Sequence, residues 1–195
     1  MVSLFPDAGV RQITATDYDE RMLEHLHGRF ADQPLFDVLS LKIDSPESVE
    51  RFSRRSFDRI SCLNVLEHIE ADLLALRHMH QLLAPHGKLV LLVPALPFLY
   101  GSLDALVGHY RRYTKKSIKN VLTATGFTVE YVSYMNFWGM FSWFTAGKIF
   151  QHQSFSARAC RRLDTFVPFL EKMELLIRPP FGQTLIAVAS KKAFS

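Results

Sequence analysis

The sequence predicts an α/β fold in which strands and helices alternate along the chain. Short runs of β-branched and apolar residues are followed several times by stretches with apolar residues at helical spacing. One run, Lys88–Pro94 (KLVLLVP), is nearly all apolar, which is typical of a strand buried on both faces of a parallel sheet. Of the 195 residues, 48% are hydrophobic and 22% charged, which favours one globular domain over residues 1–195.

The first part of the chain predicts two strand–helix pairs. A strand over Ile13–Thr16 ends at Asp17, and a helix follows from Asp19. A second extended run, Phe36–Ile43, is closed by Asp44. Ser45 and Pro46 are residue types of a helix N-cap and first helical position, so a second helix is expected there. The apolar faces of the two helices are expected to contain Met22, Leu23, Leu26 and Phe30 in the first, and Val49 and Phe52 in the second.

The rest of the chain continues the alternation. Strands are predicted over Phe57–Asn64, Lys88–Pro94, Phe127–Tyr134 and Thr184–Ser190. A helix over Ala71–Ala84 is expected to stop at Pro85-His86-Gly87, and another is expected to begin at Thr114 and end at Gly126. Residues 136–180 are expected to form a helical, aromatic-rich insertion before the last strand.

Composition excludes several classes of protein. The net charge of +4 comes without a long Lys/Arg run, so no nucleic-acid partner is expected. Cys62 and Cys160 do not make a disulfide framework, and Cys62 is expected in the core. Neither a secretory signal nor an apolar run of membrane-spanning length is visible, which favours the cytoplasm.

Sequence spacing also argues against a metal centre and several enzyme classes. The pairs His25/His27 and His78/His80 are two residues apart, which points the rings to different faces of a helix. No Cys/His cluster has zinc-site spacing, so no metal is expected. Phosphate-loop, nucleophile-elbow and Tyr-x-x-x-Lys motifs are also missing, which disfavours NTPases, hydrolases and short-chain dehydrogenases.

Four strings resemble the class I S-adenosylmethionine-dependent methyltransferase superfamily, in particular its type 11/12/23 small-molecule and glycan branch. They are TATDYDERML (14–23), FDRISCLNVLEHIEADLLALRHMHQLLAPHGKLVLLVP (57–94), GHYRRYT (108–114) and ATGFTVEYVSYMN (124–136). The resemblance implies a Rossmann-like, doubly wound sheet whose last two strands form a reversed hairpin, with S-adenosyl-L-methionine at the carboxyl ends of the strands. It also implies a first strand and an acid-x-Gly-x-Gly loop, but no two glycines of this sequence lie two positions apart. We therefore expect these 195 residues to lack that strand and loop and to bind the cofactor weakly.

The resemblance assigns cofactor-binding roles to residues at the ends of strands. Asp17 would hold the ribose hydroxyls, and Tyr18 would pack on the adenine face. Asp44 would contact the adenine amino group, and Asn64 would face the methionine moiety and the substrate. The alternatives are ordinary ones: a loop or N-cap acid at Asp17, a surface aromatic at Tyr18, and turn or capping chemistry at Asp44.

His109 is the candidate general base, because it lies in a loop at the expected substrate mouth and a neutral imidazole suits removal of a hydroxyl proton. Asp104, Arg111 and Tyr113 are the candidate substrate-binding residues, with the Arg111-Arg112 pair suited to a phosphate or carboxylate. The alternatives are a packed loop histidine and a solvated arginine pair. Glu67 and His68 are expected to begin a helix or line the substrate edge rather than act in catalysis.

The segment Phe137–Phe144 is the densest apolar stretch of the chain and holds both tryptophans. It is either an interfacial helix or lid over a lipid-like substrate, giving peripheral membrane contact through 137–150, or a helix packed in the core or at a homodimer face. The leading functional hypothesis is methyl transfer to a small-molecule, glycan or lipid-linked acceptor. The rival is a non-catalytic protein of methyltransferase fold that acts as a binding or membrane-associated subunit.

Overall fold

The computed structural model describes residues 9–145 and 179–192. The chain divides into two compact units, Met1–Ser53 and Arg54–Ser195, and each is described by itself. The expected insertion 136–180 falls mostly outside the described residues, which include only 136–145 and 179–180 of it. No helix in the described part of the chain has the length and apolar character needed to cross a membrane.

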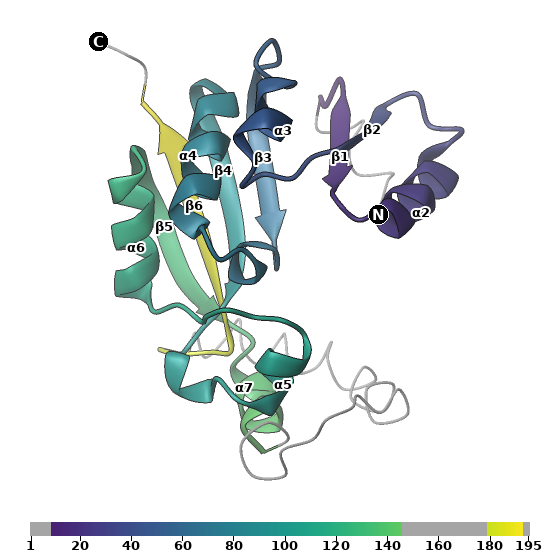
Figure 1. Ribbon diagram of the computed structural model, residues 1–195. Coiled ribbons are helices and arrows are strands. Elements are labelled where there is room, and N and C mark those ends of the chain that lie inside the picture. The colour runs from purple at the N-terminus through teal and green to yellow at the C-terminus, as the bar shows by residue number, and fades with distance from the viewer. Residues whose placement is uncertain (1–8, 146–178, 193–195) are drawn as a thin grey trace. The chain divides into compact units, whose positions relative to one another are not determined.

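The first unit is a pair of parallel strands with two helices (Figure 1). Strand β1 (Ile13–Asp17) pairs with β2 (Phe36–Ser40), with Asp17 opposite Ser40. Asp19 caps helix α2 (Glu20–Phe30) by accepting backbone N–H groups, as the sequence predicts. Ser45 does the same for α3 (Pro46–Glu50), and Val49 and Phe52 are buried as expected. On α2, in contrast, no side chain is buried, and Met22 is half exposed.

The second unit contains a four-stranded sheet in the order β3-β4-β6-β5. Strands β3 and β4 are parallel, whereas β6 is antiparallel to both β4 and β5. The reversed terminal hairpin that the resemblance implies is therefore confirmed (Figure 1). The strand bounds are β3 Phe57–Leu63, β4 Leu83–Pro94, β5 Phe127–Met135 and β6 Thr184–Lys191.

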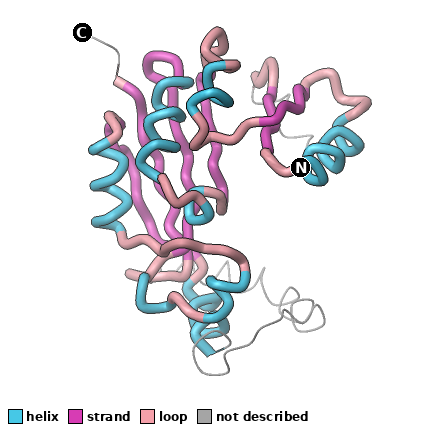
Figure 2. The backbone as a smooth tube through the Cα atoms, viewed as in Figure 1, coloured by secondary structure: helices cyan, strands magenta, loops and turns pink. Residues whose placement is uncertain are grey.

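Short helices connect these strands, and two longer ones cover one face of the sheet (Figure 2). They are η1 Leu66–His68, α4 Asp72–Leu82, η2 Pro97–Leu99, α5 Ser102–Leu106, α6 Lys115–Ala124 and α7 Phe137–Phe144. Helices α4 and α6 contact each other and lie on the same face, while α5 and α7 lie beyond the end at which β3 and β4 finish (Figure 1). Thr114 caps α6 through the N–H of Ser117, as predicted, and Gly126 follows its end with φ +93°.

The core lies between the sheet and these two helices. On β4, Leu89, Leu91 and Val93 are fully shielded, but the alternate residues Val90 and Leu92 are only half-buried. The expectation that this strand is buried on both faces is therefore wrong for the described residues, because α4 and α6 pack on one face only. Cys62 lies in the core, as expected.

The boundary between α4 and β4 also differs from the sequence expectation. The helix ends at Leu82, and the strand begins at Leu83, which pairs with Phe57. The backbone of Leu83 is already extended, with φ −73° and ψ 139°, so the helix stops before Pro85-His86-Gly87. A register shift between Phe57 and Arg59 accommodates that tripeptide within the strand pairing.

Among the described residues the strands form two separate sheets, β1–β2 and β3-β4-β6-β5. Among the described residues, no backbone pairing joins β1, which ends at Asp17, to β3, which leads to Asn64. The fold is therefore an α/β fold with one parallel pair and one mixed sheet.

Candidate active site

The candidate site lies at the carboxyl ends of the parallel strands β3 and β4. Beyond β3 the chain turns at Asn64 into η1, and beyond β4 it continues through α5 into the loop 107–114. Two backbone hydrogen bonds join the segments, from Tyr110 N–H to the Glu67 carbonyl and from Tyr113 N–H to the Pro94 carbonyl. Open α/β sheets bind their ligands at this edge, because the loops that follow the strands converge there.

A buried carboxylate holds the histidine at the centre of this region. Asp104 is fully buried, and its Oδ1 lies 2.8 Å from Nδ1 of His109, whose side chain is 11% exposed. An ionised carboxylate only accepts hydrogen bonds, so Nδ1 carries the proton and donates it. In the neutral ring, Nε2 is then the basic nitrogen. The sequence-predicted residues Asp104 and His109 are thus brought together as a pair.

Three other donors saturate the same carboxylate. Oδ1 also accepts a 2.7 Å bond from Nε of Arg112, and Oδ2 accepts bonds from the Gly101 N–H (3.1 Å) and Nε1 of Trp143 (3.0 Å). Burial opposes the charge on Asp104, but hydrogen bonds from His109, Arg112 and Trp143 outweigh it and lower the pKa of the carboxyl to about 2. Asp104 is therefore a fixed anion that orients His109.

Glu67 lies on the other side of the histidine. It is 1% exposed, and its Oε1 is 3.9 Å from Nε2 of His109. Burial raises the pKa of this carboxyl, although electrostatic interactions with His109 and Arg112 act in the opposite direction. Its Oε2 has no hydrogen-bond partner among the described residues. The site thus combines an oriented imidazole with a buried carboxyl that accepts a proton more readily than usual.

The remaining sequence candidates in this loop are engaged with protein groups. Arg111 forms a 2.8 Å ion pair with Asp72 and donates to the Glu70 carbonyl. Tyr113 is buried, and its hydroxyl donates a 2.8 Å bond to the same Asp72. Burial raises the pKa of that hydroxyl, as do the bond to Asp72 and its charge. These contacts tie the loop to the start of α4, and any substrate role of Arg111 and Tyr113 remains a proposal.

The candidates Asp17, Tyr18 and Asp44 belong to the first unit. Asp17 ends β1, and its Oδ1 accepts the backbone N–H groups of Tyr18 (2.7 Å) and Asp19 (3.0 Å). The Tyr18 ring is 70% exposed, so its face is open to a ligand. Asp44 precedes the N-cap Ser45, which is consistent with the turn chemistry expected there.

Asn64 occupies the turn directly after β3. Its φ is +54°, in the left-handed region that asparagine tolerates better than most residues, and its N–H donates to the Leu92 carbonyl. The residue is exposed at the carboxyl edge of the sheet. That Asn64 faces a ligand stays a prediction.

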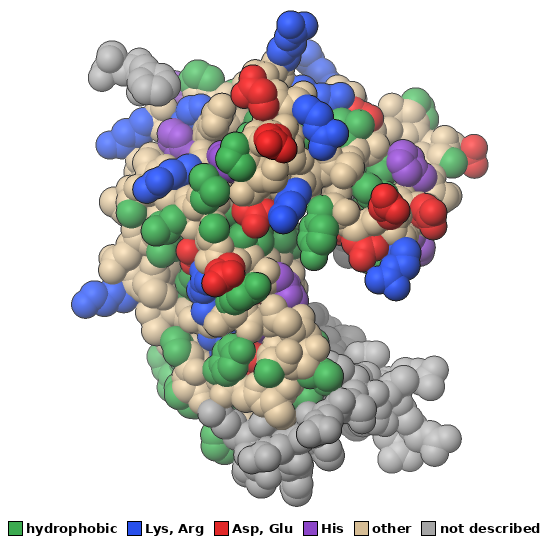
Figure 3. All heavy atoms as spheres, in the orientation of Figure 1, with side chains coloured by type: hydrophobic (Ala, Val, Ile, Leu, Met, Phe, Trp, Pro, Cys, Tyr) green, Lys and Arg blue, Asp and Glu red, His purple; other side chains and the backbone are tan. Residues whose placement is uncertain are grey.

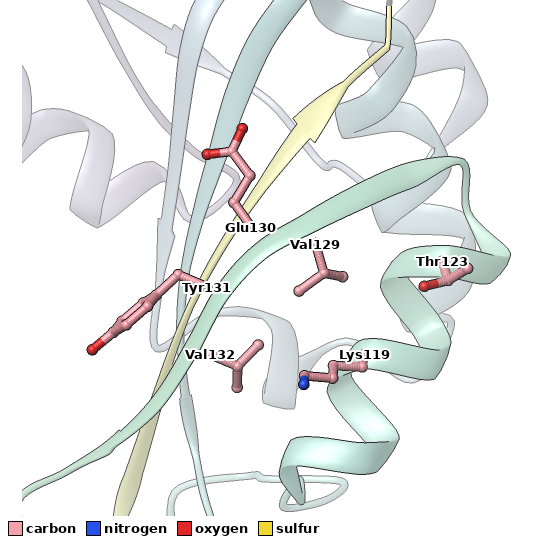
Figure 4. A pocket seen from close by; sticks show the side chains of 6 residues that line it. All are labelled: Lys119, Thr123, Val129, Glu130, Tyr131 and Val132. Atoms are coloured by element: carbon pink, nitrogen blue, oxygen red, sulfur yellow. The ribbon is translucent and has the colours of Figure 1, made fainter.

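A shallow pocket elsewhere on the second unit does not coincide with these residues. Lys119 and Thr123 of α6 line it together with Val129–Val132 of β5, and the two valines project toward the helix (Figure 4). Its Glu130 forms a 2.7 Å ion pair with Lys88. No sequence-predicted site residue lines this pocket, so it adds nothing to the candidate site.

Two side chains of the candidate site were not predicted from the sequence to contact Asp104 or His109. Glu67 was expected to start a helix or line the substrate edge, but its side chain is buried against His109. The only available signal was an acid beside the apolar residues of the string NVLEHI. Trp143 comes from the aromatic segment and donates a hydrogen bond to Asp104. The two residues are 39 positions apart in the sequence, so no local pattern predicts this contact.

Comparisons with known proteins identify the family. A sequence profile described as a methyltransferase domain matches residues 1–132. No curated protein sequence matches the chain. Similar solved structures include an S-adenosylmethionine-dependent methyltransferase from Mesorhizobium loti, with 16% identity, a TM-score of 0.60, and coverage of 93% of this chain and 81% of that one.

Two further structures are components of longer chains. The CurJ carbon methyltransferase is 20% identical with a TM-score of 0.57, and phosphoethanolamine N-methyltransferase 2 of Haemonchus contortus, in complex with S-adenosylmethionine, is 16% identical with a TM-score of 0.59. Each match covers 93% of this chain but only 42% and 44% of the other chain. Because the profile covers more than half of the sequence, this chain belongs to the methyltransferase-domain family within the class I, S-adenosylmethionine-dependent methyltransferases.

Proposed function

We propose that the chain transfers the methyl group of S-adenosylmethionine to a hydroxyl of a small-molecule, glycan or lipid-linked acceptor, with His109 as general base. The observation that carries this proposal is the 2.8 Å bond from Nδ1 of His109 to the buried Asp104. It leaves Nε2 to accept the acceptor's proton. Asp104 stabilises the imidazolium that results, as an orienting carboxylate does in other acid–base pairs.

The proposed reaction is an in-line displacement at the sulfonium. The acceptor oxygen forms a bond to the methyl carbon while the carbon–sulfur bond breaks, and its proton passes to Nε2 of His109. The products are the methylated acceptor and S-adenosylhomocysteine. Because the sulfonium is already activated, the protein contributes mainly by positioning the oxygen and removing its proton.

The residues present fit the adenosine part of the cofactor better than its methionine part. Asp17 is a half-buried acid whose Oδ2 has no bond among the described residues, and Tyr18 has an open ring face. In this proposal they hold the ribose and adenine, Asp44 contacts the adenine amino group, and Asn64 faces the methionine end. No Gly-x-Gly pair exists in this sequence to approach the carboxylate and amine of that end.

An apolar acceptor is favoured by the surface next to the site. Hydrophobic side chains gather over the part of the second unit that carries α5 and α7 (Figure 3). We call Trp138, Phe141 and Phe181, which pack around Phe137, the aromatic surface. Each of its three members is at least 38% exposed, and Trp143 of the same helix bonds to Asp104. An aromatic surface joined to the base in this way suits an acceptor with a lipid portion, drawn from a membrane.

The test is formation of S-adenosylhomocysteine by the whole chain with a panel of hydroxylated small molecules, glycans and lipid-linked alcohols. His109→Ala should lower turnover by about 10²–10⁴-fold. His25→Ala, an exposed histidine on α2, is the matched control and should leave turnover unchanged. Wild-type turnover in the His109→Ala variant would show that His109 is not the general base. If no acceptor is methylated by a folded, cofactor-saturated protein, the rival non-catalytic binding role is favoured instead.

A further inference from the structure

Three side chains at the candidate site lie close enough to share one cation. Glu67, His68 and His109 each offer one ligand atom, and these atoms all lie within 4.8 Å of one another. Glu67 and His68 are neighbours in η1, whereas His109 comes from the loop after α5. Because the ligands come from two segments 41 residues apart, no local zinc-site spacing exists in the sequence.

The carboxylate of this cluster is buried and incompletely satisfied. Glu67 is 1% exposed, and its Oε2 has no hydrogen-bond partner among the described residues. Its Oε1 lies 3.9 Å from Nε2 of His109, which is longer than a hydrogen bond. Protonation does not resolve the problem, because a protonated Oε2 would be a donor that lacks an acceptor. A buried carboxylate oxygen without a partner is costly, whereas a cation bound between the carboxylate and the imidazole would satisfy both groups.

His109 is already oriented as a ligand. Its Nδ1–H donates to Asp104, so the lone pair of Nε2 is on the side of the ring near Glu67. Histidines that bind metals nearly always donate their other ring N–H to a carboxylate or carbonyl in this way. Asp104 is itself anchored by Arg112, Gly101 and Trp143, which fixes the orientation of the imidazole.

His68 supplies the third ligand and the access route. Its ring lies 4.7 Å from that of His109 at an interplanar angle of 74°, so the two rings are not stacked against each other. The side chain is exposed, which opens the cluster to ions in solution.

We propose that Glu67, His68 and His109 form a binding site for a divalent transition-metal ion, with zinc as the best match. Two imidazole nitrogens and one carboxylate oxygen suit zinc and its neighbours in the first row, whereas magnesium and calcium prefer oxygen ligands throughout. Three protein ligands leave a fourth position for water. The ion and the acceptor's proton compete for the same lone pair of His109, so metal binding and base catalysis exclude each other.

Calorimetric titration of the metal-free whole chain with Zn²⁺, without cofactor or acceptor, tests the site independently of methyl transfer. We expect one ion per chain, and no binding of Mg²⁺ under the same conditions. Asp104→Asn, which alters the orienting carboxylate, should weaken Zn²⁺ binding roughly 10–100-fold, and Glu67→Gln or His68→Ala at least as much. His25→Ala is the control, because its histidine is exposed and lies in the other unit.

Circular dichroism should show that Glu67→Gln retains the fold, since the substitution preserves the shape of the side chain. If that variant does not fold, His68→Ala still decides the question, because this side chain is exposed. Absence of stoichiometric Zn²⁺ binding, or equal affinity in wild type and both ligand variants, would overturn the proposal. Those results would leave the methyl-transfer proposal standing, and failure of methyl transfer would likewise leave the metal site standing.

Discussion

At the scale of single residues, the candidate site depends on the fixed charge of Asp104. This carboxylate is fully buried and accepts four hydrogen bonds, two of them from the charged or chargeable side chains of Arg112 and His109. Removing one partner of a buried ion pair leaves the other charge unpaired in a poorly solvated place. Asp104 is therefore expected to matter for stability as well as for the orientation of His109.

Asp104→Ala should lower the free energy of unfolding by about 3–5 kcal/mol, because it leaves Arg112 buried without its counter-ion. Urea unfolding followed by circular dichroism measures this, and Asp58→Ala, at an exposed acid of β3, is the control. If Asp104→Ala lowers the free energy of unfolding no more than Asp58→Ala does, the ion pair makes no net contribution to stability.

The stabilisation by Asp104 should also depend on pH in a defined direction. Its folded-state pKa is depressed from 3.8 to about 2, so the contribution is fully present above the ordinary value and is lost as the pH falls toward about 2. The difference in stability between wild type and Asp104→Asn should therefore shrink on acidification through that interval. A difference that is constant from neutral pH down to about 2 would contradict the assigned shift.

Asp17 carries the residue-scale prediction in the first unit. Asp17→Ala should weaken binding of S-adenosylmethionine by about 1–3 kcal/mol, the range for a hydrogen bond to a charged group. Calorimetry with the cofactor measures the effect, and Asp32→Ala, an exposed acid after α2, controls for the loss of charge. Unchanged affinity in a folded Asp17→Ala protein would remove this residue from the site.

At the scale of elements, helix α7 contributes different side chains to the site network and to the exposed aromatic surface. Trp143 bonds to Asp104, and its ring lies 5.1 Å from the guanidinium carbon of Arg112, so it belongs to the site network. Trp138 and Phe141 belong to the exposed aromatic surface. The two sets therefore allow membrane contact and site architecture to be tested separately.

If the aromatic surface contacts membranes, the protein should sediment with anionic liposomes at low salt, and the double change Trp138→Ser, Phe141→Ser should abolish this. Trp143→Phe, which removes only the bond to Asp104, is the matched control and should still sediment. Failure of the unaltered protein to sediment, together with a dimer in analytical ultracentrifugation, would favour a homodimer face instead.

The elements differ in how far the sequence predicts them, and the reason is the range of the interactions involved. Caps at Asp19, Ser45 and Thr114 were predictable because a side chain bonds to a backbone N–H within three residues. The start of β4 at Leu83 was not, because a pairing with Phe57 overrides the local helix signal. In the site, His109 and Asp104 were candidates from the sequence, but the burial of Glu67 depends on segments that meet only in the fold.

At the scale of the whole molecule, the two separate sheets matter for cofactor binding. No ladder joins β1 to β3 among the described residues, and the sequence contains no acid-x-Gly-x-Gly loop. A strand edge without a partner leaves backbone groups to be satisfied by water or another segment. The sheet of the second unit has the order β3-β4-β6-β5, and the sequence contains no Gly-x-Gly pair of the kind that the resemblance implies for the methionine end of the cofactor.

We therefore expect weak binding of S-adenosylmethionine by the 195-residue chain, and stronger binding when a strand and an acid-x-Gly-x-Gly loop precede it. Backbone N–H groups of such a loop and of the following helix N-terminus supply the donors for the methionine carboxylate. Titration calorimetry on both proteins compares the affinities. Micromolar binding by the 195 residues alone would contradict the expectation and would mean that another segment serves this role.

The central claim is that Asp104 holds the proton of His109 on Nδ1 and leaves Nε2 as the basic nitrogen of the site. Long-range ¹H–¹⁵N correlation NMR on the metal-free protein, labelled at histidine, reports the tautomer of the neutral ring directly, with His109→Asn providing the assignment. In the wild-type protein the neutral His109 ring should carry its proton on Nδ1. In the Asp104→Ala variant the proton should move to Nε2. A neutral His109 that carries its proton on Nε2 in the wild-type protein would contradict the central claim.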